Sequence, residues 1–124
     1  MTIPKLSDGD WRVLCALWGA EDGLTLGQVV EGLQGETGWS RNTVFTYLTR
    51  MQAKGLVDID RALTPHRYRA AVSREDCAAA ERRGLLHRAY QGSEGKLVAA
   101  FLKEERLTAQ ERDELRRLLD EMEV

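Results

Sequence analysis

A run of polar, basic and aromatic side chains recurs at helical spacing between residues 41 and 54, and its chemistry suits DNA. At about 100° per residue, one side of this segment collects Asn42, Phe45, Thr46, Thr49 and Arg50. An amide can pair with adenine, and an aromatic ring or a threonine methyl group can meet the methyl group of thymine. We therefore expect Asn42, Phe45 and Thr46 to face base edges.

The remaining polar residues of the segment are better placed for the phosphate backbone, which sets the register of a protein on DNA. The predicted phosphate contacts are Arg41, Thr43, Thr49, Arg50 and Lys54. No acidic residue occurs between residues 39 and 57, whereas an ordinary solvated helix face carries mixed charges. Two alternatives stay open: a plain surface helix, or a helix that docks on protein. Phe45 has an alternative of its own, which is packing against Trp39.

The same segment carries the signals of one complete helix. Val44, Tyr47, Leu48 and Met51 form the apolar stripe that a buried face requires. Ser40 is a good N-cap and Gly55 a good C-terminal stop.

Two further helices are expected upstream, because Ser7 with Asp10 and Thr25 with Gln28 form capping-box patterns. Their predicted buried residues are Trp11, Leu14, Cys15 and Trp18 in the first helix, and Leu26, Val29, Val30 and Leu33 in the second. Glycine-rich breaks at 19–23 and 35–38 separate three short helices, which favours a compact trihelical unit.

After residue 55 the pattern becomes β-prone. Residues 56–59 and 67–70 flank a turn at 62–65, and Tyr68 is expected to face inward between two arginines. We expect this hairpin to be a wing that contacts the adjacent DNA backbone or minor groove. Its predicted DNA-binding residues are Arg61, His66, Arg67 and Arg69, although His66 is equally well explained as a plain loop residue.

From Ser73 onward the pattern is helical again, and Ser93 and Thr108 are further N-cap candidates. The apolar residues of these helices are Leu97, Val98, Phe101, Leu102, Leu115, Leu118, Leu119 and Met122. Short helices hide only part of such stripes from each other, so we expect a second copy of the chain to cover them across a two-fold axis. The alternative is that they fold back on the chain's own first domain.

These patterns predict a mainly α fold with a small β-hairpin. Residues 1–72 are expected to form a winged helix-turn-helix DNA-binding domain, and residues 73–124 a helical dimerisation domain. The net charge of the 124 residues is −2, but residues 39–72 hold six basic and two acidic side chains, a local charge of +4. Such a basic patch matters more to a nucleic-acid partner than the overall charge does.

Other function classes find little support in the sequence. It contains no HExxH motif, no glycine-rich phosphate loop and no cysteine–histidine arrangement typical of a nucleophile, so we expect no enzyme. Cys15 and Cys77 lack metal-ligand spacing and are interpreted as small buried hydrophobes, with no cofactor or metal. The longest apolar run is too short for a membrane span, and the N-terminus lacks a leader pattern, which predicts a cytoplasmic protein without membrane insertion.

Residues 43–51, TVFTYLTRM, with KGLV at 54–57, resemble the recognition-helix signature of the penicillinase-repressor family of BlaI/MecI type. The likeness covers nearly the whole chain, including the tryptophans of the first helix, Tyr68 in the wing and the tail from Leu97 to Leu119. It implies a bacterial repressor that binds double-stranded palindromic operator DNA as a homodimer.

The resemblance also bears on control. In well-known members a membrane-bound zinc-protease sensor triggers cleavage in the dimerisation domain, and the corresponding bond here is Ala100–Phe101. Those members have asparagine where this chain has Ala100. Control by a small ligand or by a protein partner, instead of proteolysis, stays open as the alternative.

Overall fold

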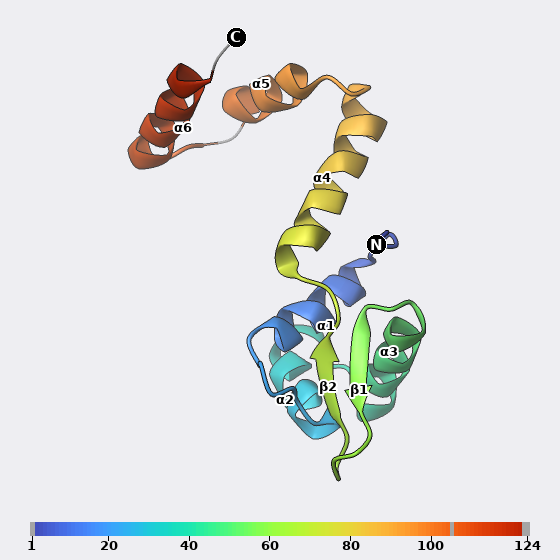
Figure 1. The fold of residues 1–124 in the computed structure, drawn as a ribbon. Coiled ribbons are helices and arrows are strands. Elements are labelled where there is room, and N and C mark those ends of the chain that lie inside the picture. Colours follow the sequence, from blue (N-terminus) through green and yellow to red (C-terminus); the bar gives the residue numbers. More distant parts are fainter. Residues whose placement is uncertain (1, 105, 123–124) are drawn as a thin grey trace. The chain divides into compact units, whose positions relative to one another are not determined.

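The computed structural model describes residues 2–104 and 106–122, which form helices and one hairpin (Figure 1). In chain order these are α1 (Asp8–Trp18), α2 (Leu26–Thr37), α3 (Arg41–Ala53), β1 (Val57–Asp60), β2 (Arg67–Ala70), α4 (Arg74–Tyr90), α5 (Glu94–Glu104) and α6 (Ala109–Glu121). The chain divides into two compact units, Met1–Glu81 and Arg82–Val124, so that the boundary lies within α4.

The predicted capping residues begin the first helices. The Ser7 hydroxyl accepts a hydrogen bond from the Asp10 backbone N–H, and the Asp10 carboxylate accepts one from the Ser7 N–H, at 3.1 and 3.0 Å. Thr25 and Gln28 form the same reciprocal pair at the start of α2. Each box satisfies two backbone donors that the first helical turn leaves free. The capping predictions for these two helices are therefore confirmed.

The end of α2 differs from the prediction of a break at residues 35–38. The helix continues through Gly35 to Thr37 and stops at Gly38, whose positive φ of 64° ends it in the left-handed conformation. A glycine inside a helix costs about 1 kcal/mol, which the packing of Val29 and Leu33 outweighs.

One hydrophobic core joins the first three helices to the hairpin. Its buried side chains include residues of α1 (Val13, Leu14, Leu17), α2 (Val29, Leu33), α3 (Val44, Leu48, Met51) and the start of the hairpin (Leu56, Val57), with Tyr68 from β2. Each such aliphatic side chain contributes roughly 1.5–3 kcal/mol when it leaves water. Because α3 supplies three of them, its orientation is fixed by the core.

Of the four residues predicted for the buried stripe of α1, only Leu14 is buried. Val13 and Leu17 complete the buried apolar face, and Cys15 is exposed. Trp11 and Trp18 are half-buried and meet edge to face, with ring centroids 6.0 Å apart. Wide amphipathic rings cover the border of the core from either side, so the tryptophan spacing marks the edge of the buried face and not its centre.

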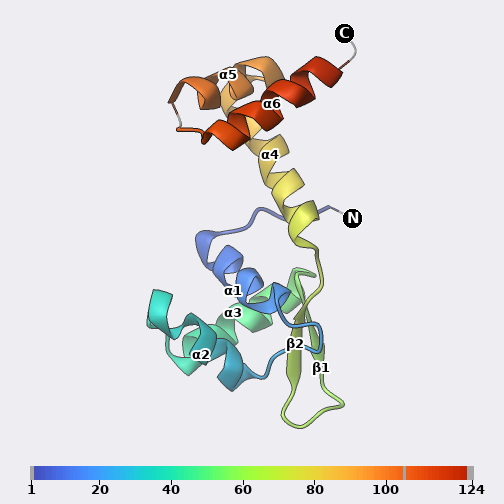
Figure 2. The same ribbon diagram turned by 90° about the vertical axis from the view of Figure 1, so that its left-hand side faces the viewer.

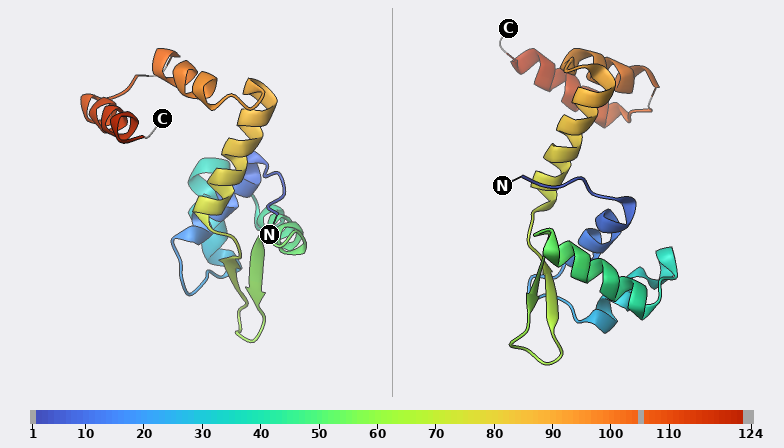
Figure 3. Two further views of the ribbon diagram at one scale, coloured as in Figure 1. Left: turned by 45° about the horizontal axis from the view of Figure 1, so that its top comes forward. Right: turned by 90° about the vertical axis from the view of Figure 1, so that its right-hand side faces the viewer.

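The hairpin is antiparallel, with Val57 opposite Ala70 and Ile59 opposite Tyr68. Tyr68 is buried, as predicted, whereas the first strand starts one residue later than expected. The loop before α2 adds a third backbone segment, because Leu24 and Tyr68 exchange two hydrogen bonds of 2.9 and 2.7 Å. The loop of the hairpin projects beyond the three helices of this unit (Figures 2 and 3).

The start of α4 is tied to α1. The Trp18 indole N–H donates to the Val72 carbonyl at 2.8 Å, and the Arg74 guanidinium lies 4.6 Å from the centroid of the Trp18 ring. Cys77 is buried here, as expected. Its burial is the larger cause of the raised pKa of its thiol, and the nearby negative charge of Asp76 raises that pKa further.

The second unit contains α5 and α6. Thr108 and Glu111 form the third capping box, and the hydrogen bonds from the Thr108 backbone and hydroxyl lower the pKa of the Glu111 carboxyl. None of the described residues of α5 or α6 is fully buried. Within the residues that the structure describes, each helix is too short or too polar to cross a membrane.

Three helices packed on a β-hairpin, with α2 and α3 joined by a short turn, form a winged helix-turn-helix. The mainly α fold class predicted from the sequence is confirmed.

Candidate nucleic-acid interface

The core divides α3 into two faces, because Val44, Leu48 and Met51 are completely buried. The opposite face is open to solvent and carries the predicted reading and phosphate residues: Arg41, Asn42, Phe45, Thr46, Thr49 and Arg50. Thr43 is half-buried at the border, and Lys54 is exposed at the C-terminal end. This exposed face presents hydroxyl, amide, guanidinium and aromatic groups and no carboxylate, which is a surface that suits nucleic acid.

An aromatic stack fixes the start of α3. The Trp39 and Tyr47 rings lie nearly parallel, at 10°, with centroids 4.5 Å apart. The Arg50 guanidinium lies 5.0 Å from the centroid of the Tyr47 ring, within cation–π range. The alternative in which Phe45 packs on Trp39 is therefore wrong, because Tyr47 occupies that position and Phe45 stays 47% exposed.

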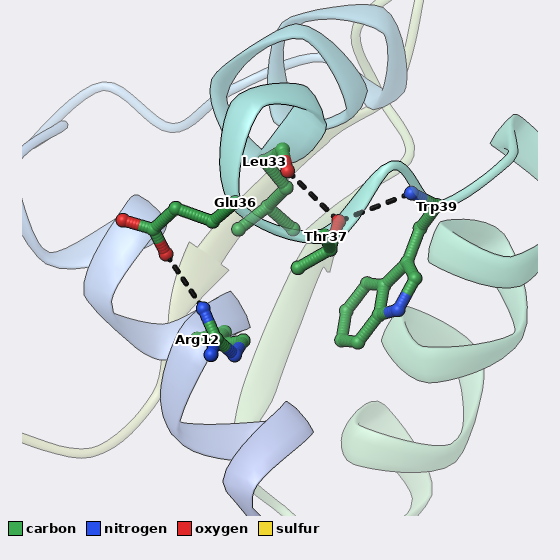
Figure 4. A network of polar contacts seen from close by, with 5 residues as sticks. All are labelled: Arg12, Leu33, Glu36, Thr37 and Trp39. Atoms are coloured by element: carbon green, nitrogen blue, oxygen red, sulfur yellow. Dashed lines mark hydrogen bonds and ion pairs between the residues drawn. The ribbon is translucent and has the colours of Figure 1, made fainter.

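The turn that carries Trp39 is held by α2. The Thr37 hydroxyl donates to the Leu33 carbonyl at 2.8 Å and accepts from the Trp39 backbone N–H at 3.1 Å (Figure 4). In the same view Arg12 of α1 pairs with Glu36 at 2.9 Å. This exposed ion pair adds little energy, so the hydrogen bonds and the stack set the path into α3.

Local hydrogen bonds also order the first turns of α3. The Ser40 hydroxyl accepts from the Thr43 backbone N–H at 3.2 Å and donates to the Thr43 hydroxyl at 3.1 Å. The Thr46 hydroxyl donates to the Asn42 carbonyl at 2.9 Å. Both threonine hydroxyls can still accept a hydrogen bond. The Asn42 side chain is exposed and keeps all of its hydrogen-bond donors and acceptors for a ligand.

The wing residues differ in their freedom to reach a ligand. Arg67 is half-buried and donates to the Gly23 carbonyl at 3.2 Å, and Arg69 lies 3.6 Å from the Asp60 carboxylate. Arg61 and His66 are exposed in the loop of the hairpin. Contacts of all four with DNA stay a prediction, and the internal partners of Arg67 and Arg69 make Arg61 the freer cation.

Three contributors to this surface escaped sequence reasoning. Leu24 and Gly23 brace β2, and Gly23 has a φ of +81° at a point where a Cβ atom would come within 3.0 Å of the Tyr68 carbonyl oxygen. Leu63 lies 44% exposed in the loop of the hairpin. Only the glycine at 23 gave a signal in the sequence, and that signal indicated a break between helices.

The second unit presents a different kind of surface. The predicted dimerisation residues are exposed in the single chain at Val98, Phe101, Leu102, Leu118, Leu119 and Met122, while Leu97 and Leu115 are half-buried. A hollow of about 190 Å³ between α5 and α6 is lined mainly by leucines, among them Leu102, Leu107 and Leu119. Exposed apolar residues in this number are typical of surfaces that associate with a partner, and dimerisation through them stays a prediction.

The predicted cleavage position lies on α5. Ala100 is half-buried and Phe101 is exposed, and both line a hollow of about 170 Å³ with Tyr90 and Glu104. Among residues 2–104 and 106–122, no three histidine, cysteine, aspartate or glutamate side chains are grouped so that they could hold a metal ion.

Comparison with known proteins places this architecture. The profile of the penicillinase repressor family matches residues 6–121. The methicillin resistance regulatory protein MecI of Mammaliicoccus sciuri is 26% identical over 116 residues, which cover 94% of each chain. The transcriptional regulator BlaI of Mycobacterium tuberculosis is 33% identical over 123 residues, covering 98% of this chain and 88% of that protein.

A solved structure shares the fold. Monomeric Bacillus licheniformis BlaI, determined in solution in complex with the blaP half-operator, superimposes with a TM-score of 0.52 at 24% identity, over 60% of this chain and 90% of that one. The members of this family are transcriptional repressors and not enzymes. Since the family profile spans both compact units, the chain belongs to the penicillinase repressor family.

Proposed function

We propose that this protein represses transcription by binding, as a homodimer, to a palindromic DNA operator. The observation that carries the proposal is the exposed, carboxylate-free face of α3, held in place by three core residues and accompanied by a hairpin with a basic loop. The half-operator complex of the Bacillus licheniformis relative supports the choice of DNA as the partner. If the partner is operator DNA, the protein acts in the bacterial cytoplasm, where that DNA lies.

The residues of α3 divide the work by position. Asn42 and Thr46 face base edges in the major groove, because they project from the middle of the exposed face. Phe45 faces a base edge from the side of the helix that lies toward Leu26 of α2. The remaining predicted contacts hold phosphates and set the register: Arg41, Thr43, Thr49, Arg50 and Lys54, with Arg61, His66, Arg67 and Arg69 from the wing.

Dimerisation follows from the apolar residues of α5 and α6. Leu118 and Leu119 are 55% and 57% exposed, so each keeps more than half of its hydrophobic surface in water as long as the chain is alone. A second chain with the same surface can cover them symmetrically. Joining two DNA-binding units in one dimer raises the affinity for an operator with two half-sites by a factor of roughly 10²–10⁴. The gain arises because the second unit is held at a high effective concentration once the first has bound. We therefore assign DNA binding to residues 1–72 and dimerisation to residues 73–124.

Release from DNA would follow from loss of the dimer. Cleavage of the Ala100–Phe101 bond, prompted by a membrane-bound zinc-protease sensor, would separate α6 from the DNA-binding unit. The bond lies inside the helix α5, and a protease needs extended backbone, so α5 must open locally first. Since α5 has no fully buried residue in the single chain, its opening costs less there than in the dimer, where its apolar residues are covered. Control by a small ligand or a protein partner is the alternative, to be tested alongside.

Selection of bound sequences from a pool of random duplexes tests the proposal. We expect an inverted repeat with half-site centres one or more helical turns apart, and an affinity that depends on both halves. A chain truncated after residue 72 should lose most of that affinity. Recovery of no preferred sequence, or of a single undivided site bound equally well by the truncated chain, would contradict the proposal.

A further inference from the structure

An open hollow of about 420 Å³ lies between the beginnings of α2 and α3. Its lining consists of Leu26, from the first turn of α2, and Arg41, Asn42 and Phe45 from α3. The Phe45 ring is half-exposed, and Leu26 is half-buried against the core. The lining is therefore apolar at Phe45 and Leu26 and polar at Arg41 and Asn42.

About half of the Phe45 side chain stays exposed to water. Trp39 is stacked on Tyr47. A large, half-exposed apolar ring at the side of a polar, DNA-facing surface is unfavourable in the free protein, since water must solvate it. Its presence there is explained if the ligand itself brings an apolar group to that place.

The major groove offers one such group. Guanine, cytosine and adenine present hydrogen-bond donors and acceptors at their edges, whereas thymine adds a methyl group at C5. A methyl group projecting from a base edge fits an apolar corner flanked by an amide and a guanidinium, which can contact the neighbouring base and a phosphate.

We infer that Phe45 and Leu26 form a receptor for the 5-methyl group of one thymine in each half-site. The inference rests on the proposed function and makes it more specific, because it assigns a base preference to a position that side-chain hydrogen bonds do not read. The receptor takes a methyl-bearing pyrimidine and rejects uracil at the same position, although the two bases pair identically.

The expected effect follows from the burial of one methyl group, about the same as one CH₂ in a core. Removing it should weaken binding about fourfold in each half-site. Because the site is symmetric, replacing both thymines should raise the dissociation constant about fifteenfold for the dimer.

The experiment uses the full-length protein and the duplex selected from random sequences. Symmetry-related thymines are replaced in pairs by deoxyuridine, one pair per duplex, and the dissociation constants are measured by fluorescence anisotropy. We expect one pair to show the fifteenfold loss. Phe45→Ala should bind the thymine and uracil duplexes equally, and Phe45→Leu, which keeps an apolar contact, should retain most of the difference. Phe45 is exposed, so neither variant should disturb the fold.

Gln52→Ala is the control, because Gln52 is exposed on the same helix and is not among the proposed DNA contacts. It should leave the uracil penalty unchanged. The inference is overturned if no pair shows a penalty, if the penalty persists in Phe45→Ala, or if Gln52→Ala abolishes it. Failure to select any duplex would overturn the proposed function and this inference together, whereas a selected duplex that is indifferent to uracil would overturn the inference alone.

Discussion

Gly9, in the first turn of α1, should be intolerant of any side chain because of the Tyr47 ring of α3. A Cβ atom at position 9 would lie 2.5 Å from Cζ and 2.6 Å from Cε1 of that ring, and closer still to its hydroxyl oxygen. The ring cannot swing away freely, since Trp39 is stacked on it and the Arg50 guanidinium lies over it. Gly9→Ala must therefore shift part of the stack that carries the DNA-facing helix.

The magnitude combines opposing effects. Forcing an extra methyl group into a packed contact costs about 1–3 kcal/mol, and weakening the Trp39–Tyr47 pair costs about 0.5–1.5 kcal/mol. Alanine improves helix propensity over glycine by about 1 kcal/mol. We expect a net loss of about 2 kcal/mol for Gly9→Ala, measured by urea denaturation followed through tryptophan fluorescence. Affinity for the selected operator should fall as well, because Arg50 depends on the same stack.

A double-mutant cycle separates this clash from other effects. In a Tyr47→Leu background the ring is absent, so Gly9→Ala should become neutral or stabilising. Gly32→Ala in α2 is the control, since a Cβ atom there meets nothing within 4 Å, and it should stabilise by about 1 kcal/mol. The reasoning is refuted if Gly9→Ala stabilises the native sequence as Gly32→Ala does, or if its cost is the same with and without the Tyr47 ring.

Three further outcomes are expected. If each subunit neutralises about four phosphates, the slope of log affinity against log salt concentration should be near −7 by titration, and a slope shallower than about −3 would contradict joint docking of helix and wing. Arg50→Ala should weaken binding to all duplexes about equally, whereas Asn42→Ala should cost about 1–3 kcal/mol mainly at one base position, and titrations that show the reverse would exchange the two roles. Leu119→Ala should weaken the dimer about 30- to 150-fold in sedimentation velocity, because Leu119, which is 57% exposed in the single chain, would be buried in both chains, at about 2–3 kcal/mol per dimer. Glu114→Ala on the same helix should leave the dimer unchanged, and equal effects of the two variants would argue against an apolar interface.

Local signals in the sequence were sufficient for the helix starts and for the two faces of α3. A capping box involves residues three apart in the sequence. The starts of α1, α2 and α6 can therefore be predicted from Ser7, Thr25 and Thr108 without knowledge of the tertiary structure. The stripe of Val44, Leu48 and Met51 is equally local, because its spacing already defines a face.

Contacts between elements that are distant in the sequence could not be predicted in the same way, because they depend on which element packs against which. Cys15 shares the helical spacing of the two tryptophans, and only the packing of α1 shows that this side faces solvent. The choice of Tyr47 over Phe45 as the partner of Trp39 depends on the turn held by Thr37. The hydrogen bond from Arg67 to Gly23 joins residues 44 positions apart, and no periodicity reports it.

The mass of the protein–operator complex tests the central claim most directly. Sedimentation equilibrium of the full-length chain, alone and with the selected duplex, should give a dimer at micromolar concentration and two chains on each duplex. Single chains at micromolar concentration, together with one chain per duplex at undiminished affinity, would contradict the claim that two copies joined through α5 and α6 read one operator.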